Sequence, residues 1–280
     1  RVGHLTVHGS MPPYRINELI DLAENIDLRG RGGAGFPFHR KLRAVKQSAE
    51  RREGRTAVVV NGTEGEPACK KDAAILLRSP HLVIDGATLA ADALGAEDVV
   101  IGVTRRDVEK SVQDAIDERP PSERVRVVRL PERFVTGEGT ALTSGLNGGP
   151  ALPIGRKIRT SEMGLSGLPT LLSNTETFAQ LAIAARLDAL NFRSTGLATE
   201  PGTVMLTVTG ARGSIIVETP FGVPMSYILQ LCGLTAGQGV LVGGYHGKFL
   251  DANAAGQALI SRESLEAFGA RLGAGAVLPI

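Results

Sequence analysis

The sequence is poor in cysteine and in aromatic residues, and each shortage excludes a class of site. Only Cys69 and Cys232 occur among 280 residues, whereas an iron–sulfur cluster usually needs four thiolates and a cysteine-rich zinc site needs nearly as many. We expect two reduced cysteines in a cytosolic protein, in preference to a single disulfide. Aromatic residues make up 4% of the chain and tryptophan is absent, which argues against a stacking surface for single-stranded nucleic acid.

The sequence also lacks a large net charge of either sign, and it lacks long apolar runs. Lysine and arginine number 31 against 29 acidic residues, a net charge of +2, so the overall charge does not indicate a nucleic-acid partner. Without a run of about 18 apolar residues and without a signal peptide, we expect no direct membrane span. The expected location is cytoplasmic, which includes the periphery of a membrane complex. The length allows one large domain or two modest ones.

Glycine is abundant instead, with 35 residues, and one glycine-rich segment is informative. Residues 28–38 read LRGRGGAGFPF and satisfy G-x-G-x-x-G at Gly30, Gly32 and Gly35. A dinucleotide-binding turn follows a strand, whereas this loop follows the helical pattern of residues 15–26. Two arginines, the glycine amides and a following helix start favour a phosphate cradle over a flexible turn. Glycine also lets the backbone approach a planar ring closely.

Short apolar runs alternate with amphipathic patterns through the first part of the chain. Strands are expected at 56–60, 98–103 and 124–130, and helices at 15–26, 37–49, 72–95 (broken around Ser79-Pro80), 105–118 and 174–187. Strands separated by helices predict an α/β fold with a largely parallel sheet and helices on both sides. Residues 131–170 are rich in glycine and proline and lack periodicity, as functional or mobile connections do.

The last third of the sequence predicts a smaller β-rich unit. Residues 203–209 and 214–218 favour a hairpin, followed by a short helix at 224–232 and a strand at 239–242. The final 30 residues add a weak helix and end in a run typical of a strand.

Four segments occur in an order that matches one family. They are the glycine loop with Lys41, then Asn61-Gly-Thr-Glu-Gly-Glu-Pro67, Gly137-Glu-Gly-Thr-Ala-Leu142 and Pro169-Thr-Leu-Leu-Ser-Asn-Thr-Glu-Thr177. Together they resemble the FMN- and NADH-binding 51-kilodalton subunit of respiratory complex I, the NADH-quinone oxidoreductase. Related subunits of NAD-dependent hydrogenases and formate dehydrogenases belong to the same family.

The resemblance implies a domain order. It implies an FMN-binding α/β domain at 1–195 and a ubiquitin-like β-grasp (SLBB) domain at 196–255. Residues 256–280 would begin the connection to an iron–sulfur domain, so a [4Fe-4S] cluster would lie in a region absent from this chain. Either the chain is a portion of a longer protein or the cluster has been lost.

The resemblance also implies a set of site residues. Carried over position by position, the FMN-binding residues would be Gly30, Arg31, Gly32, Gly33, Lys41, Asn61, Glu64, Gly137, Glu138, Ser173 and Asn174. The nicotinamide side would comprise Phe36, Glu66, Phe134 and Arg156. The flavin would carry the chemistry, so we expect no catalytic side chain and no metal ligand.

Departures from the family pattern concern the expected nicotinamide side. The second acid of the Gly-Glu-Glu motif is Gly139 here, the acid before the first glutamate of the second segment is Thr63, and Arg156, Lys157 and Arg159 add positive charge. Two hypotheses follow: a preference for NADPH, whose extra phosphate suits arginine, or loss of nicotinamide binding, with the flavin exchanging electrons with a ferredoxin or iron–sulfur subunit in a hetero-oligomeric redox complex. A rival of another class is a non-catalytic scaffold subunit. The basic residues can equally form a plain surface loop.

Overall fold

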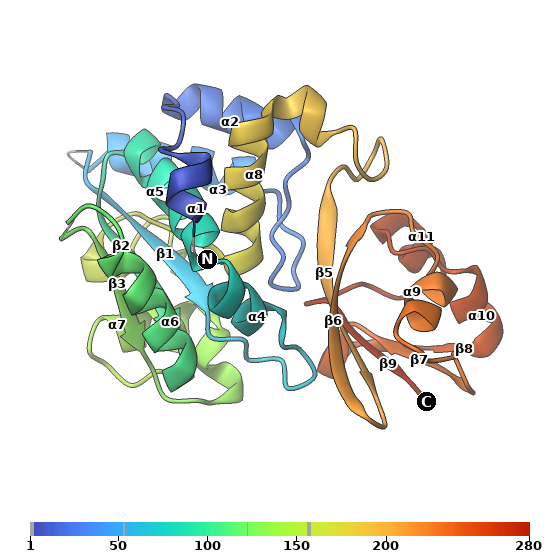
Figure 1. Cartoon of the computed structure of the whole chain (residues 1–280). Helices are drawn as coiled ribbons and strands as arrows, with labels where there is room; N and C mark the ends of the chain where they lie inside the picture. The colour runs from blue at the N-terminus through green and yellow to red at the C-terminus, as the bar shows by residue number, and fades with distance from the viewer. Residues whose placement is uncertain (1–2, 53, 122, 156–157) are drawn as a thin grey trace.

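The chain forms a larger α/β body and a smaller β-rich body beside it, as the computed structural model in Figure 1 shows. The structure describes residues 3–52, 54–121, 123–155 and 158–280. Arg156, which we assigned to the nicotinamide side, therefore lies outside the described residues, as does Lys157.

The larger body is built on a four-stranded parallel sheet in the order β3-β2-β1-β4. Its strands are β1 (Thr56–Gly62), β2 (Ala96–Val103), β3 (Val125–Arg129) and β4 (Thr170–Asn174). The valines of β1 are fully buried, as expected for a central strand that is covered on both faces. Asn61 is paired in register with Asn174, so parallel pairing brings the polar ends of β1 and β4 to one sheet edge.

Helices cover both faces of this sheet, which confirms the predicted fold class. One face carries the main core, to which Leu19, Phe38, Ile84 and Phe178 belong. The helices of this body other than α7 are α1 (His4–His8), α2 (Ile16–Asn25), α3 (Phe38–Glu50), α4 (Lys71–Arg78), α5 (Pro80–Leu94), α6 (Arg106–Asp117) and α8 (Thr175–Phe192). A smaller core on the other face includes Leu142 of α7 (Gly139–Leu146).

Local sequence signals explain several helix ends. Pro80 starts α5 directly after α4 ends at Arg78, because proline fits the first turn of a helix but not its interior. Gly95 ends α5 in the left-handed conformation, at φ 64°. The glycine loop lies between α2 and α3, as predicted, so it follows a helix and not a strand.

The smaller body contains a five-stranded mixed sheet in the order β6-β5-β9-β7-β8. Its elements are β5 (Thr203–Gly210), β6 (Gly213–Pro220), α9 (Met225–Leu231), β7 (Gly239–Val242), β8 (Lys248–Asp251), α10 (Ala252–Gln257), α11 (Arg262–Ala267) and β9 (Ala276–Pro279). The β5–β6 hairpin is antiparallel, as expected.

The strand β9 lies in the middle of this second sheet. It pairs in parallel with β5 and antiparallel with β7, and Val277 is fully buried. The sequence-based boundaries assigned 256–280 to a connection, whereas this strand is part of the fold of the second body. Its partner β5 lies about seventy residues earlier in the chain, and a pairing between segments that far apart leaves no local signal in the sequence.

Candidate functional site

A cavity of about 440 Å³ opens where the carboxyl ends of β1 and β4 meet the glycine loop. We call it the strand-end cavity. This is the edge at which open α/β sheets place ligands, and the volume falls within the roughly 300–1,000 Å³ of small-molecule sites. Eight predicted site residues line it together: Gly32, Gly33, Asn61, Glu64, Glu66, Phe134, Gly137 and Asn174.

Asn61 fixes the backbone around the cavity with both ends of its amide. Its Nδ2 donates to the carbonyl oxygen of Gly137 at 2.8 Å. Its Oδ1 accepts from the N–H and the hydroxyl of Thr63, at 3.2 and 2.7 Å. Asn61 therefore ties the segment before α7 to the acidic turn that follows β1.

The side chain of Asn174, which also lines the cavity, is fixed by hydrogen bonds at both ends of its amide. Its Nδ2 donates to Oδ2 of Asp72 at 2.7 Å, and its Oδ1 accepts from Nζ of Lys71 at 3.1 Å and from the N–H of Glu176 at 3.0 Å. The last of these bonds caps α8, because Asn is a favoured residue before a first helical turn. The amide orientation is thereby determined.

A buried ion network contacts the side chain of Asn174. Lys71 is 1% exposed, and its Nζ lies 2.8 Å from Oδ1 of Asp72 and 3.0 Å from Oε2 of Glu176. Burial alone lowers the pKa of a lysine, but these two carboxylates outweigh it and raise the pKa of Lys71 above its ordinary range. Lys71 thus stays protonated and joins both carboxylates to the side chain of Asn174.

Glu64 caps α4 from the acidic turn. Its carboxylate accepts from the N–H groups of Asp72 and Ala73, at 2.7 and 3.1 Å, in the first turn of that helix. Burial and the neighbouring Asp72 raise the pKa of the Glu64 carboxyl. Its backbone has φ 45°, a left-handed conformation that non-glycine residues rarely adopt, so the helix cap holds the turn in an unusual shape.

Glu66 connects the two bodies across the mouth of the cavity. One carboxylate oxygen accepts from the N–H of Ala68 at 3.2 Å, and the other accepts from the N–H of Tyr245 at 2.9 Å. The rings of Phe134 and Tyr245 lie edge to face, with centroids 5.4 Å apart. Gly244 makes this approach feasible, since a Cβ there would lie 2.4 Å from the Glu66 carboxyl carbon.

The glycines supply open walls and unused donors. Within the described ranges, the N–H groups of Gly32, Gly33 and Gly65 donate to no acceptor of the protein. A Cβ on Gly32 would lie 3.4 Å from Cβ of Asn174, and one on Gly137 would lie 2.9 Å from Oγ1 of Thr63. Side chains at these positions would reduce the cavity, whereas bare backbone leaves room for a ring and donors for an anion.

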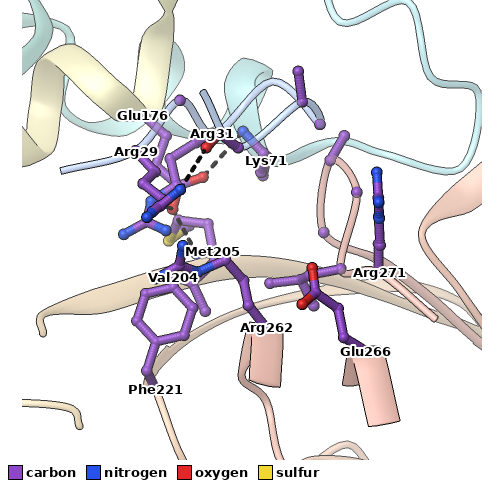
Figure 2. Close-up of a pocket in the computed structure, with 18 residues that line it drawn as sticks. Arg29, Arg31, Lys71, Glu176, Val204, Met205, Phe221, Arg262, Glu266 and Arg271 are labelled. Atoms are coloured by element: carbon purple, nitrogen blue, oxygen red, sulfur yellow. Dashed lines mark hydrogen bonds and ion pairs between the residues drawn. The ribbon is translucent and has the colours of Figure 1, made fainter. Parts of the chain in front are cut away.

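Gly30 and Arg31 line a second cavity, of about 270 Å³, between the glycine loop and the second body. We call it the inter-domain cavity (Figure 2). Arg31 has 13% of its side chain exposed and lies 3.9 Å, Nε to Oε1, from Glu176. Its guanidinium carbon lies 4.7 Å from the ring centroid of Phe221. Burial lowers the pKa of Arg31.

Other predicted site residues line neither cavity. Lys41 donates to the carbonyl oxygen of Leu172 at 2.9 Å, and burial lowers its pKa to about 8. Glu138 is exposed and caps α7 through the N–H groups at 140 and 141. Ser173 is 1% exposed, and its hydroxyl has no partner in the described part of the chain. Phe36 is 46% exposed, outside the walls of both cavities.

Several cavity residues were not predicted as site residues. Lys71 and Asp72 follow the second segment in the sequence, but no local pattern indicates that both are buried. The second body contributes Gly243, His246, Arg271, Gly273 and Ala274 to the strand-end cavity. No periodicity or motif in the sequence indicates that these loops dock against β1 and β4.

Cys69 lies in the cavity wall as an inert thiol. Its Sγ lies 3.2 Å from the carbonyl oxygen of Ala274, and burial raises its pKa to about 12, so it stays protonated and unreactive. Cys69 and Cys232 are both free. In the described residues no three His, Cys, Asp or Glu side chains gather as metal ligands would, and none of the described helices has the length and apolarity to span a bilayer.

A known protein family matches much of the larger body in sequence. Residues 23–183 match the family described as the Nuo51 FMN-binding domain. The F 2 subunit of the NADH-quinone oxidoreductase of Rhizobium meliloti is 28% identical over 244 residues, which cover 81% of this chain and 57% of that protein. The HoxS alpha subunit of the NAD-reducing hydrogenase of Cupriavidus necator is 26% identical over 270 residues, 90% of this chain and 44% of that protein.

A solved structure supports the same fold for both bodies. A chain of the air-oxidized NAD⁺-reducing [NiFe]-hydrogenase superimposes with a TM-score of 0.83 at 27% identity, over 95% of this chain and 46% of that one. The present chain spans roughly half of the length of these relatives.

Proposed function

The chain belongs to the family of the Nuo51 FMN-binding domain, and on that premise we propose that it binds FMN non-covalently in the strand-end cavity. The observation that carries the proposal is the convergence of the glycine loop, Asn61 and Asn174 on one cavity of about 440 Å³. Gly30, Arg31, Lys41, Glu138 and Ser173, which the resemblance also implies, stay predictions.

The donor chemistry fits a flavin nucleotide. The unused N–H groups of Gly32 and Gly33 suit a phosphate or another anion. Gly32, Gly65 and Gly137 line the cavity without side chains, which suits the packing of a planar ring against the backbone.

In this proposal the protein positions the flavin and the electron donor and excludes water from them. Bound FMN supplies the chemistry of hydride acceptance and single-electron release. Both asparagine amides are held by bonds to the protein, so the walls are preorganised and do not reorganise as charge develops. No side chain needs to act as a general acid or base.

We propose NADH or NADPH as the donor, in an electron-transfer oxidoreductase subunit of a larger redox complex. The test is an anaerobic titration of the FMN-loaded protein with each nucleotide, followed by the flavin absorbance. Bleaching by either nucleotide supports the proposal. A colourless protein that takes up no FMN would overturn it and favour a scaffold subunit.

The environment of Glu66 favours a second candidate electron donor, a ferredoxin-type protein. The two carboxylate oxygens of Glu66 accept from the N–H groups of Ala68 and Tyr245, so a nicotinamide amide bound to this acid would have to share or displace these contacts. A ferredoxin-type partner needs no such rearrangement. Bleaching by reduced ferredoxin, with no response to either nucleotide, would identify this alternative.

A further inference from the structure

The inter-domain cavity is a compartment separate from the strand-end cavity. Gly33, Arg271, Gly273 and Ala274 form the wall that the two share. Arg29 and Arg31 approach from the glycine loop, and Arg262 and Glu266 approach from α11 on the opposite side (Figure 2). With about 270 Å³, the compartment has room for a small polyatomic group.

Cationic side chains dominate its walls. Arg29, Arg31, Lys71, Arg262 and Arg271 line it against the carboxylates of Glu176 and Glu266. Arginine presents a planar fork of donors that matches the oxygens of phosphate, which makes a cluster of this kind typical of phosphate recognition.

Two of these arginines are held in place from outside the cavity. Asp27 accepts from Nε of Arg29 at 2.9 Å and from Nη2 of Arg262 at 2.7 Å. One carboxylate thus orients two guanidinium groups that come from different bodies. Asp27 is not part of the cavity wall, so the carboxylate that pairs with these two arginines lies outside the cavity.

Arg31 brings a buried donor that lacks an acceptor. Its Nε is buried without a hydrogen-bond partner among the described residues. The nearest carboxylate oxygen, Oε1 of Glu176, lies 3.9 Å away and already accepts from the N–H of Met205 at 2.8 Å. Buried donors are almost always paired, so this one points to a ligand acceptor in the cavity.

Arg271, an exposed residue that lines the same cavity, adds a further cation at its edge. Val204, Phe221 and Leu272 supply apolar surface beside the arginines. From this donor set we propose that the inter-domain cavity binds a phosphate group, either as free phosphate or on a small organic phosphate, independently of the flavin. The proposal does not depend on the proposed function.

The test is calorimetry on the FMN-saturated protein at constant ionic strength, with inorganic phosphate and ribose 5-phosphate as separate probes. Tighter binding of ribose 5-phosphate would identify an organic phosphate, and equal binding would identify the free ion. Arg262→Gln removes a donor of this cavity alone and should weaken binding about tenfold or more. Arg212→Gln, at an exposed turn of the β5–β6 hairpin, is the control and should bind as the wild type does.

A second pair of variants keeps the test valid if Arg262→Gln does not fold. Glu266→Gln removes the exposed carboxylate from the cavity wall and should tighten phosphate binding about two- to threefold. Glu263→Gln lies on the same helix outside the wall and should leave the affinity unchanged. An equal response of the two variants would contradict the proposed site.

Competition distinguishes this cavity from the flavin site. Phosphate that binds only to FMN-free protein and is displaced by FMN would mean that the cavity receives the phosphate of FMN itself, which overturns an independent site. Absence of binding in either state overturns the proposal as well. If the protein takes up no FMN, the proposed function fails, and the same titration without flavin still decides about the phosphate.

Discussion

Lys41 illustrates how a single buried group controls stability. Its folded pKa of about 8 lies below the ordinary value of 10.5 because the ammonium is removed from water. Between these values the unfolded chain holds a proton that the native chain lacks, so stability rises with pH through this window. From pH 7 to pH 9 this contributes about 1 kcal/mol to the free energy of unfolding of the FMN-free protein.

Lys41→Met should abolish that gain, as measured by urea denaturation at pH 7 and pH 9. Cys69, whose raised pKa of about 12 acts in the opposite direction above the ordinary thiol value of 9, is present in both proteins and cancels in the difference. A variant with the same pH dependence as the wild type would show that Lys41 titrates normally.

Gly32 tests the placement of the flavin at a single position. A valine there would meet Cβ of Asn174 at 3.4 Å on one side and would fill the strand-end cavity on the other. The position has an ordinary φ, so we expect Gly32→Val to fold with little loss of stability and to lose at least about tenfold in FMN affinity. Fluorescence quenching of FMN measures the affinity. Gly256→Val, a helical position in open space, should bind FMN normally.

At the scale of elements, the crossing of α5 and α8 depends on one glycine. A Cβ on Gly86 would lie 1.9 Å from the carbonyl oxygen of Phe178, so alanine forces the two helices apart. Gly86→Ala should destabilise the protein by at least about 3 kcal/mol in thermal or urea denaturation. Gly256→Ala, with no atom within 4 Å, should be neutral or slightly stabilising. Similar melting curves for the two variants would contradict this packing.

Elements with strong periodicity could be predicted, whereas elements defined by distant partners could not. The apolar stripe of 15–26 and the valine run at 56–60 predict α2 and β1 because their patterns are local. The strand β4 has five residues and pairs with β1 on one side, at the end of a segment rich in glycine and proline. The helix α7 depends on the Glu138 cap more than on an apolar stripe, so the pattern missed it.

The candidate site likewise contains residues that local motifs predict and residues that they do not. The glycine loop, Asn61 and Asn174 follow from motifs at the ends of elements, and parallel pairing of β1 with β4 then brings the asparagines together. The residues from 243–246 and 271–274 become cavity walls because two bodies dock. Docking depends on contacts such as that of Glu66 with Tyr245, which no local pattern specifies.

At the scale of the whole molecule, the cavities depend on the integrity of the second body. The segment 271–275 contributes to both cavities and leads directly into β9. The N–H of Thr207 on β5 donates to the carbonyl oxygen of Gly275 at 2.8 Å, and Gly243 next to β7 donates to Ala276 at 2.9 Å. The position of this segment is therefore set by the central strand of the second sheet.

Val277→Asp tests this dependence, because Val277 is fully buried in the second core and an unpaired buried carboxylate costs several kcal/mol. The second body should unfold, which denaturation would report as a separate early transition, and FMN affinity should fall at least about tenfold as the 271–274 wall is lost. Ile280→Asp, three residues on and 63% exposed, should retain both properties. Normal FMN affinity in Val277→Asp would mean that the first body binds the flavin unaided.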